Sequence, residues 1–348
     1  MKQLLETTTH EKSPLLGPQR EAMANPAMLK TAFTGSQAAY LRSTPRTIGH
    51  RGFKAAAPEN TIAAFKAATE AGAEALETDL HLTRDGVVVL CHDETLQRCY
   101  GNKARVRDLS WAEISRLRTL REPRQPMPRL IDLLEYLNQP GLEQTQLMLD
   151  IKTHDDAEEI MKRTAETLAS VPSQRPWSTR VTPCCWSATY IKLSMKYLPD
   201  YPITHVGFSI TYARCLTHIP NISFSMLRHA LASPCGGRFI REMKQKGIPV
   251  HVWTVNEENW MEWSIERGLS GVITDEVALF REVCNRSGSD QASITRSRWK
   301  NAIPTLYQTL RFWAEIAVVH LLITLHMSRQ WLKHGSLARH ISRELNGG

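Results

Sequence analysis

The sequence lacks the signatures of several common protein classes. Its seven cysteines are an odd number and include no Cys-x-x-Cys pair, so neither a disulfide scaffold nor a zinc ribbon is indicated. No Gly-x-Gly-x-x-Gly motif follows the first predicted strand, so a dinucleotide site lacks its main signal. Because no 7–15-residue apolar core follows a basic amino terminus, a cleaved secretory signal is not expected. The cysteines instead indicate reduced thiols in the cytosol or a similar compartment.

What the chain does contain is an ordinary globular composition with an uneven charge. It has 348 residues, of which 42% are hydrophobic and 22% charged, and this length allows one large barrel or two medium domains. Much of the net charge of +8 lies in residues 286–348, where nine Lys and Arg residues stand against three acids. A basic tail of this kind suggests an anionic partner, either a membrane surface or nucleic acid.

Three segments differ in pattern. Residues 1–45 show no sustained apolar period and predict a disordered arm, in which Glu11–Leu16 resembles an acidic dileucine sorting signal. Residues 46–285 alternate short β-rich runs with amphipathic helical runs. Eight strands are predicted at Thr47–His50, Ala75–Leu80, Gln146–Ile151, Arg180–Trp186, Ile203–Phe208, Ile222–Met226, Pro249–Val255 and Gly271–Thr274. Eight such units over about 240 residues predict an α/β fold, the (β/α)₈ or TIM barrel, although alternation alone also fits an open doubly wound sheet.

Shorter features refine this expectation. The run Gly86–Cys91 follows the second strand closely and predicts a hairpin or an insertion. One helix is expected between Asn60 and Gly72, since Asn is a good N-cap and Gly often follows a helix end. Another helix is expected over Glu113–Leu120.

Acidic residues gather at the predicted strand ends, where a barrel of this type carries its chemistry. Glu77 and Asp79 are two residues apart and therefore point to the same side of one strand, and Asp150 ends the next barrel strand. Three carboxylates at one mouth repel each other unless they are neutralised. One Mg²⁺ or Ca²⁺ ion with oxygen ligands is the simplest neutraliser; salt bridges to Arg51 and Lys152 are the alternative.

Two histidines come from the same rim. His50 ends the first strand and His92 lies in the loop after the second strand, so the pair suits general acid and base catalysis near neutral pH. Either histidine alone would more often be structural. Arg51 and Lys152 could hold a phosphate, Arg by its planar fork and Lys as a point charge.

Six ordered sequence blocks carry a resemblance. They are His50-Arg51-Gly52, Pro58-Glu59-Asn60-Thr61, Glu77-Thr78-Asp79, His92-Asp93, Trp253-Thr254-Val255-Asn256 and Gly271-Val272-Ile273-Thr274-Asp275. Together they resemble the glycerophosphodiester phosphodiesterase family over about residues 47–280. The stretch Leu147–Lys152 and the hydrophobic tail are closer to the fungal phosphatidylglycerol phospholipase C branch.

The resemblance implies a TIM barrel with one divalent metal ion, Mg²⁺ or Ca²⁺. By this resemblance the metal ligands are Glu77, Asp79 and Asp150, and the acid/base pair is His50 and His92. The substrate contacts are Arg51, Lys152 and Trp253. Asp150 stands where many family members have Glu. Asn60 is expected either to cap its helix or to make a polar contact with the metal site.

The implied activity is that of a membrane-associated, metal-dependent phospholipase C that hydrolyses phosphatidylglycerol to diacylglycerol and glycerol 3-phosphate. In that reaction a glycerol hydroxyl attacks phosphorus, one histidine removes its proton and the other protonates the leaving alkoxide. Two alternatives remain. The protein could be a phosphodiesterase of soluble, deacylated phospholipids, or a non-catalytic barrel that binds membranes.

Residues 304–333 bear on this choice. Their longest uncharged window, Ile316–Ser328, has 13 residues, whereas a spanning helix needs about 20. An amphipathic helix lying in the membrane surface is therefore expected; a helix packed on the barrel and a tilted or hairpin insertion are the alternatives. The expected location is the cytosolic face of an intracellular membrane, with mitochondrion, lipid droplet, endoplasmic reticulum and vacuole all open. No nucleic-acid partner is expected, since no known nucleic-acid-binding motif accompanies the basic tail.

Overall fold

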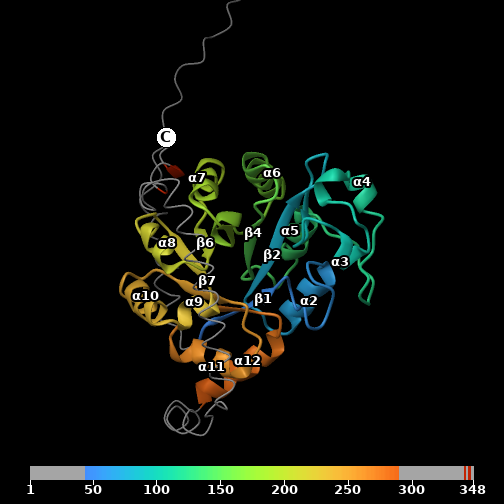
Figure 1. Ribbon diagram of the computed structural model, residues 1–348. Coiled ribbons are helices and arrows are strands. Elements are labelled where there is room, and N and C mark those ends of the chain that lie inside the picture. The colour runs from blue at the N-terminus through green and yellow to red at the C-terminus, as the bar shows by residue number, and fades with distance from the viewer. Residues whose placement is uncertain (1–43, 290–340, 342–343, 346–348) are drawn as a thin grey trace, which may run out of the picture.

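A closed barrel of eight parallel strands forms the centre of the protein (Figure 1). The computed structural model describes residues 44–289 together with Ile341, Glu344 and Leu345. The barrel strands, in spatial order, are β1 (Arg46–His50), β2 (Ala75–Leu82), β4 (Gln146–Ile151), β5 (Val181–Cys185), β6 (Ile203–Gly207), β7 (Ile222–Leu227), β8 (Val250–Trp253) and β9 (Gly271–Thr274). Because β1 pairs with both β9 and β2, the sheet closes, and the predicted TIM barrel is confirmed.

The sequence of the strands explains their burial. All eight residues of β2 are buried, as expected for a parallel strand that is covered on both faces. Inside the barrel a layer of apolar side chains packs together, namely Ile48, Ala75, Met148, Cys184, Val206 and Ile273. This layer packs the barrel interior below the mouth at which the strands end.

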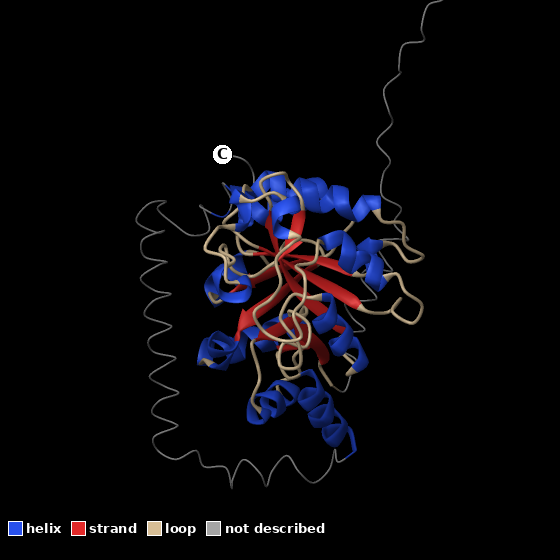
Figure 2. Ribbon diagram, turned by 90° about the vertical axis from the view of Figure 1, so that its right-hand side faces the viewer, coloured by secondary structure: helices blue, strands red, loops and turns tan. Residues whose placement is uncertain are grey.

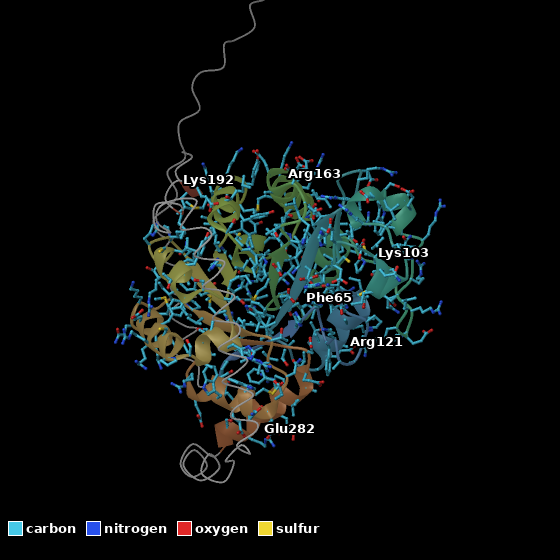
Figure 3. The ribbon with its side chains drawn as sticks, viewed as in Figure 1. Phe65, Lys103, Arg121, Arg163, Lys192 and Glu282 are labelled. Atoms are coloured by element: carbon cyan, nitrogen blue, oxygen red, sulfur yellow. The ribbon has the colours of Figure 1, made fainter. Side chains whose placement is uncertain are left out.

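Helices surround the strands, as Figures 1 and 2 show. They are α2 (Ile62–Glu70), α5 (Leu130–Leu137), α6 (Ala157–Ser170), α7 (Ala188–Tyr197), α8 (Ile210–Cys215), α9 (Arg228–Ala232), α10 (Pro234–Gln245), α11 (Glu258–Glu266) and α12 (Val277–Ser289). Their apolar sides face the sheet: Phe65 of α2 is fully buried, whereas Arg163 of α6 and Lys192 of α7 lie on the outside (Figure 3). The residue that caps α2 is Thr61, whose Oγ1 accepts a hydrogen bond from the Ala64 N–H at 3.2 Å.

An insertion, residues 83–129, separates β2 from α5. It contains β3 (Val88–Leu90), which pairs antiparallel with β2, and the short helices α3 (Gln97–Tyr100) and α4 (Trp111–Ile114). The prediction of a helix over Glu113–Leu120 was wrong, because α4 ends at Ile114. The backbone N–H groups of Thr119 and Leu120 instead donate to the carbonyls of Gln125 and Cys99. Tertiary hydrogen bonds thus replace the helical ones.

Most of the predicted arm and tail lies outside the described residues. This holds for residues 1–43 of the arm and for the expected membrane-associating helix at 304–333. Of the described tail residues, Ile341 is 2% exposed and belongs to the main hydrophobic core. No helix in the described part of the chain is both long enough and apolar enough to cross a bilayer.

Candidate active site

Three carboxylates meet at the mouth of the barrel. Glu77 and Asp79 lie on β2 and Asp150 lies on the adjacent β4, where the strand register places Asp79 beside Asp150. One carboxylate oxygen from each residue lies within 4.8 Å of the other two, and all three side chains are buried. The period-two spacing of Glu77 and Asp79 thus brings both to the same side of the strand, as predicted.

The charges at this mouth are only partly balanced. Lys152 Nζ lies 2.7 Å from Asp79 Oδ1 and 2.5 Å from Asp150 Oδ2. Burial works to raise the pKa of Asp79, but Lys152 and Arg51 outweigh it and hold the pKa below its usual range. Burial also raises the pKa of Glu77, and the neighbouring charges of Asp79 and Asp150 raise it further. Ionising Glu77 is therefore costly in the absence of a further cation.

The donor set fits a hard divalent cation. It consists of carboxylate oxygens, which Mg²⁺ and Ca²⁺ prefer. Burial, and after it the charges of Asp79 and Asp150, raise the pKa of Glu77, so a third negative charge here is unfavourable without a further cation. Ion pairs with Lys152 and Arg51, the alternative that the sequence left open, do form. These ion pairs set two cations against three carboxylates, and the pKa of Glu77 stays raised.

Asn60 contacts the carboxylates and does not cap α2. Its Nδ2 donates to Asp79 Oδ2 at 2.8 Å, and its Oδ1 accepts from Thr78 Oγ1 at 2.8 Å. The backbone of Asn60 has a φ of 54°, a left-handed conformation that Asn tolerates better than most residues. This turn directs the amide towards β2 and leaves the cap of α2 to Thr61.

Arg51 reaches the carboxylates through both its backbone and its side chain. The Arg51 N–H donates to Glu77 Oε2 at 2.9 Å, and Arg51 Nε lies 3.2 Å from Asp79 Oδ2. Its Nη1 donates to Glu59 Oε1 at 2.7 Å. The guanidinium is consequently held at the edge of the mouth, where an incoming phosphate would meet it.

His50 stands beside Glu77 in the register of β1 and β2. Its Nδ1 lies 2.6 Å from Asp275 Oδ1, so the ring donates to this carboxylate. Asn256 Nδ2 donates to the other oxygen of Asp275 at 2.9 Å. Burial opposes ionisation of Asp275, but the hydrogen bond and charge of His50 outweigh it and lower the pKa of Asp275 to about 2. A charged, fixed carboxylate thus orients the imidazole.

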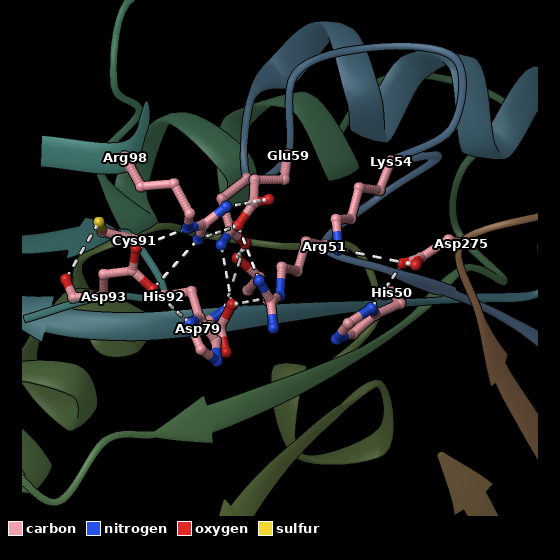
Figure 4. Close-up of polar contacts among 12 residues, drawn as sticks. His50, Arg51, Lys54, Glu59, Asp79, Cys91, His92, Asp93, Arg98 and Asp275 are labelled. Carbon is pink, nitrogen blue, oxygen red and sulfur yellow. Dashed lines mark hydrogen bonds and ion pairs between the residues drawn. The ribbon is translucent and has the colours of Figure 1, made fainter. Parts of the chain in front are cut away.

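His92 lies in the insertion just after β3. Its Nδ1 is 2.7 Å from Asp93 Oδ1, which repeats the arrangement of His50 and Asp275. Burial lowers the pKa of His92, and the positive charges of Arg51 and Lys152 add to this, while Asp79 opposes it. In Figure 4, His92 and His50 lie to the two sides of Arg51.

Two tryptophans line the mouth beside Asp150. Trp253, which was predicted to contact substrate, ends β8, and its Nε1 donates to the Ser225 carbonyl at 3.0 Å. Trp186 follows β5, and its Nε1 donates to Asp150 Oδ1 at 2.6 Å. The two rings meet edge to face, with centroids 5.8 Å apart. A contact between Asp150 and Trp186 was not predicted, although Trp186 ended a predicted strand.

Other residues that sequence reasoning did not assign complete the rim. They are Glu59, Asp93, Arg98, Asn256 and Asp275, which hold the predicted residues in place. Asn256 and Asp275 could have been found, since both lie at predicted strand ends. The site as a whole presents two imidazoles, each oriented by a carboxylate, around a buried acidic cluster. Such a site can remove a proton from one oxygen of a bound phosphodiester and give a proton to another.

Comparison with known proteins agrees with this chemistry. The sequence model of the glycerophosphoryl diester phosphodiesterase family matches residues 50–279. A glycerophosphodiester phosphodiesterase of Caldanaerobacter subterraneus subsp. tengcongensis is 27% identical over 250 residues, which cover 69% of this chain and 98% of that protein. A lysophospholipase D of Rattus norvegicus is 26% identical over 285 residues, with 70% and 87% covered.

Solved structures resemble the barrel. A glycerophosphodiester phosphodiesterase of Thermotoga maritima has a TM-score of 0.57 and 26% identity, covering 69% of this chain and 98% of that one. A phosphodiesterase of Oleispira antarctica, solved with its product sn-glycerol-3-phosphate, has a TM-score of 0.61 and 21% identity, covering 71% and 99%. The second likeness is one of fold alone.

Proposed function

The chain belongs to the glycerophosphoryl diester phosphodiesterase family and is a phosphoric diester hydrolase, and we propose that its reaction takes place at the barrel mouth. One observation carries this proposal: three buried carboxylates lie within 4.8 Å of one another, and two carboxylate-oriented imidazoles flank them. Glu77, Asp79 and Asp150 would hold one divalent cation. When bound, that cation supplies Lewis-acid stabilisation of the charge that develops on phosphate oxygens.

The basic residues bind the phosphate. Lys152 and Arg51 reach the mouth from β4 and from the end of β1, and each is anchored to the acidic cluster by ion pairs. The anchored cations need no reorganisation when an anionic diester arrives, which is the condition for efficient electrostatic stabilisation. Trp253 forms a wall beside them that the alcohol portion of the substrate contacts.

The two histidines move the protons. In each ring Nδ1 is held by a carboxylate, so we assign the exchange of protons with substrate to Nε2. One imidazole removes the proton of a glycerol hydroxyl, which attacks the neighbouring phosphorus, and the other protonates the departing alkoxide. An internal hydroxyl benefits from its proximity to phosphorus. The resulting cyclic glycerol phosphate is opened by water to glycerol 3-phosphate.

We propose soluble glycerophosphodiesters as the first substrate class, supported by the relatives that are named glycerophosphodiester phosphodiesterases. Phosphatidylglycerol, which the sequence first suggested, is the second candidate. The apolar and basic segment 304–333 favours it, because that segment would bring the mouth to anionic headgroups. In this second case the protein would work on the cytosolic face of an intracellular membrane.

A parallel assay separates these candidates. Purified full-length protein with Mg²⁺ or Ca²⁺ is offered glycerophosphocholine, glycerophosphoglycerol and phosphatidylglycerol vesicles, and glycerol 3-phosphate release is measured with and without EDTA. We expect chelatable turnover of the soluble diesters. Turnover confined to the vesicles would favour the phospholipase, and no turnover of any diester would contradict the proposed function.

A further inference from the structure

Arg98 of the insertion joins two separate parts of the mouth. It lies on α3, and Figure 4 shows its guanidinium between Glu59 and Asp93. Arg98 Nε and Nη2 donate to the two oxygens of Asp93 at 2.6 and 3.1 Å. Its Nη1 and Nη2 donate to the two oxygens of Glu59 at 2.7 and 2.8 Å. One guanidinium thus bridges two carboxylates with four charge-assisted hydrogen bonds.

The exposure of the Arg98 side chain makes this arrangement informative. The Arg98 side chain is 48% exposed, whereas that of Glu59 is 9% exposed. A half-exposed arginine ordinarily gains little from one surface ion pair, because holding a long side chain still costs conformational entropy. Two bidentate contacts to fixed partners overcome that cost, and both partners belong to the proposed site.

The Asp93 branch leads to His92. Asp93 Oδ1 accepts hydrogen bonds from His92 Nδ1 at 2.7 Å and from Arg98 Nη2 at 3.1 Å. Asp93 Oδ2 accepts one from Arg98 Nε. With both oxygens engaged by one planar fork, the carboxylate cannot rotate freely. The His92 imidazole, which donates to the same carboxylate, is thereby restrained as well.

The Glu59 branch leads to Arg51. Glu59 Oε1 accepts from Arg51 Nη1 at 2.7 Å and from Arg98 Nη2 at 2.8 Å. Burial opposes ionisation of Glu59, but the hydrogen bonds and charges of Arg98 and Arg51 outweigh it and lower its pKa to about 2. Glu59 is therefore a charged anchor that both arginines share.

We propose that Arg98 is a positioning residue that sets His92 and Arg51 relative to each other. The chain of contacts runs from Arg51 through Glu59, Arg98 and Asp93 to His92, so it spans from the end of β1 to the insertion. This inference rests on the proposed function, since it gives Arg98 the task of aligning a proton-transfer group with a phosphate-binding group. A displacement of about 1 Å between such groups can cost about 10²-fold in rate.

The test is Arg98→Gln with Arg84→Gln as the matched control. Arg84 also lies in the insertion, is 58% exposed and pairs with Glu113, but makes none of the contacts described for the mouth. With glycerophosphocholine and Mg²⁺, we expect Arg98→Gln to lower kcat about 10- to 100-fold, and Arg84→Gln to leave kcat unchanged. Arg98→Lys, which keeps the charge but not the fork, should fall between the wild type and Arg98→Gln.

A double-mutant cycle assigns the branch. If Arg98 acts through Asp93, the Arg98→Gln substitution should have a smaller effect on kcat in an Asp93→Asn background than alone. Equal kcat values for Arg98→Gln and Arg84→Gln would overturn the inference, as would a loss that tracks the melting temperature alone. Failure of the proposed function would look different, because the wild-type protein itself would then turn over no diester.

Discussion

Two sets of buried polar side chains in this protein are satisfied in opposite ways. The mouth set consists of Glu77, Asp79 and Asp150, and the remote set consists of Trp177, Arg180 and His205. In the remote set every group meets a neutral backbone carbonyl: Arg180, for example, donates to the carbonyls of Leu137, Leu142 and Thr145. In the mouth set three carboxylates lie together: Lys152 and Arg51 pair with Asp79, whereas burial and the charges of Asp79 and Asp150 raise the pKa of Glu77.

This difference separates a structural role from a functional one. A buried group that is fully hydrogen-bonded lowers the cost of its own burial and needs nothing more from outside. A buried group whose pKa is shifted by like charges lacks a counter-charge, which a ligand can supply. Substitutions in the two sets should therefore have separable effects, on stability in the remote set and on ligand binding and turnover at the mouth.

Glu77→Gln should give the largest effect on activity. The change keeps the shape of the side chain and removes its charge, so the metal site loses a ligand and kcat should fall about 10³-fold, the effect of losing several kcal/mol of Lewis-acid stabilisation. The metal-free protein should not become less stable, because the Glu77 charge is unfavourable there. Steady-state kinetics and calorimetric unfolding in EDTA measure the two quantities.

The matched control for this variant is Glu70→Gln. Glu70 is exposed on α2 and pairs with Lys66 at 3.9 Å, so its neutralisation should change neither turnover nor the response to Mg²⁺. If Glu77→Gln keeps metal-dependent turnover at the wild-type level, Glu77 is not a ligand and the mouth set has been misinterpreted.

The second prediction concerns pH and the remote set. His205 stacks on Tyr212 with centroids 5.1 Å apart, and its Nδ1 donates to the Cys185 carbonyl. Burial lowers the pKa of His205 from 6.5 to about 4, so the unfolded chain binds a proton before the folded chain does. Its neutral form thus contributes fully above pH 6.5, and about 3 kcal/mol should be lost as the pH falls to about 4.

Urea unfolding between pH 7.5 and 4.5 tests whether the free energy of unfolding falls as the pH is lowered. His205→Gln removes the titrating group and should flatten the dependence of the unfolding free energy on pH, whereas His218→Gln, at an exposed position, should not. Both variants should keep wild-type kcat at pH 7.5. Identical slopes for the two variants would show that His205 is already protonated in the folded state near pH 6.

A third prediction returns to the mouth histidines. His50→Ala and His92→Ala should each lower kcat by at least about 10²-fold, the usual effect of removing a general acid or base. Their carboxylate partners, Asp275 and Asp93, keep hydrogen bonds from Asn256 and Arg98, so we expect little change in melting temperature. His218→Ala again serves as the control. Full activity in either mouth variant would reject the catalytic role of that histidine.

Much of this architecture could be predicted from the sequence because it depends on local pattern. The eight barrel strands are short runs of apolar and β-branched residues, and the strand ends place Glu77, Asp79 and Asp150 at one mouth. Period two is enough to give Glu77 and Asp79 a common side. Neither conclusion requires knowledge of a tertiary contact.

The remaining features depend on contacts between distant parts of the chain. Arg98 and Glu59 are 39 residues apart, and Trp186 and Asp150 are 36 residues apart, so no local pattern records either pair. The helix expected at Glu113–Leu120 was lost for the same reason, since its backbone groups pair with Cys99 and Gln125. Asn60 had two plausible roles, and its left-handed backbone conformation, which directs the amide towards β2, decided between them.

The smallest predicted effect compares one substitution at the two ends of β5. Trp186→Phe removes the indole N–H that holds Asp150 Oδ1 at 2.6 Å, and Trp177→Phe removes the one that donates to the Val171 carbonyl at 2.7 Å. The first should weaken Mg²⁺ binding about tenfold, because a partner that orients a ligand is lost. The second should leave Mg²⁺ binding unchanged and lower the free energy of unfolding by about 1 kcal/mol.

Titration calorimetry with Mg²⁺ and urea unfolding of the metal-free variants measure both effects. The two changes delete the same atoms and keep an aromatic ring, so any difference between them reports what the indole N–H touches. Equal Mg²⁺ affinity in the two variants would mean that Asp150 is oriented by Lys152 alone, whose Nζ lies 2.5 Å from Oδ2. A metal-binding defect in Trp177→Phe would contradict the separation of the mouth set from the remote set, since Trp177 precedes the amino end of β5 and the metal site lies at the carboxyl ends of the strands.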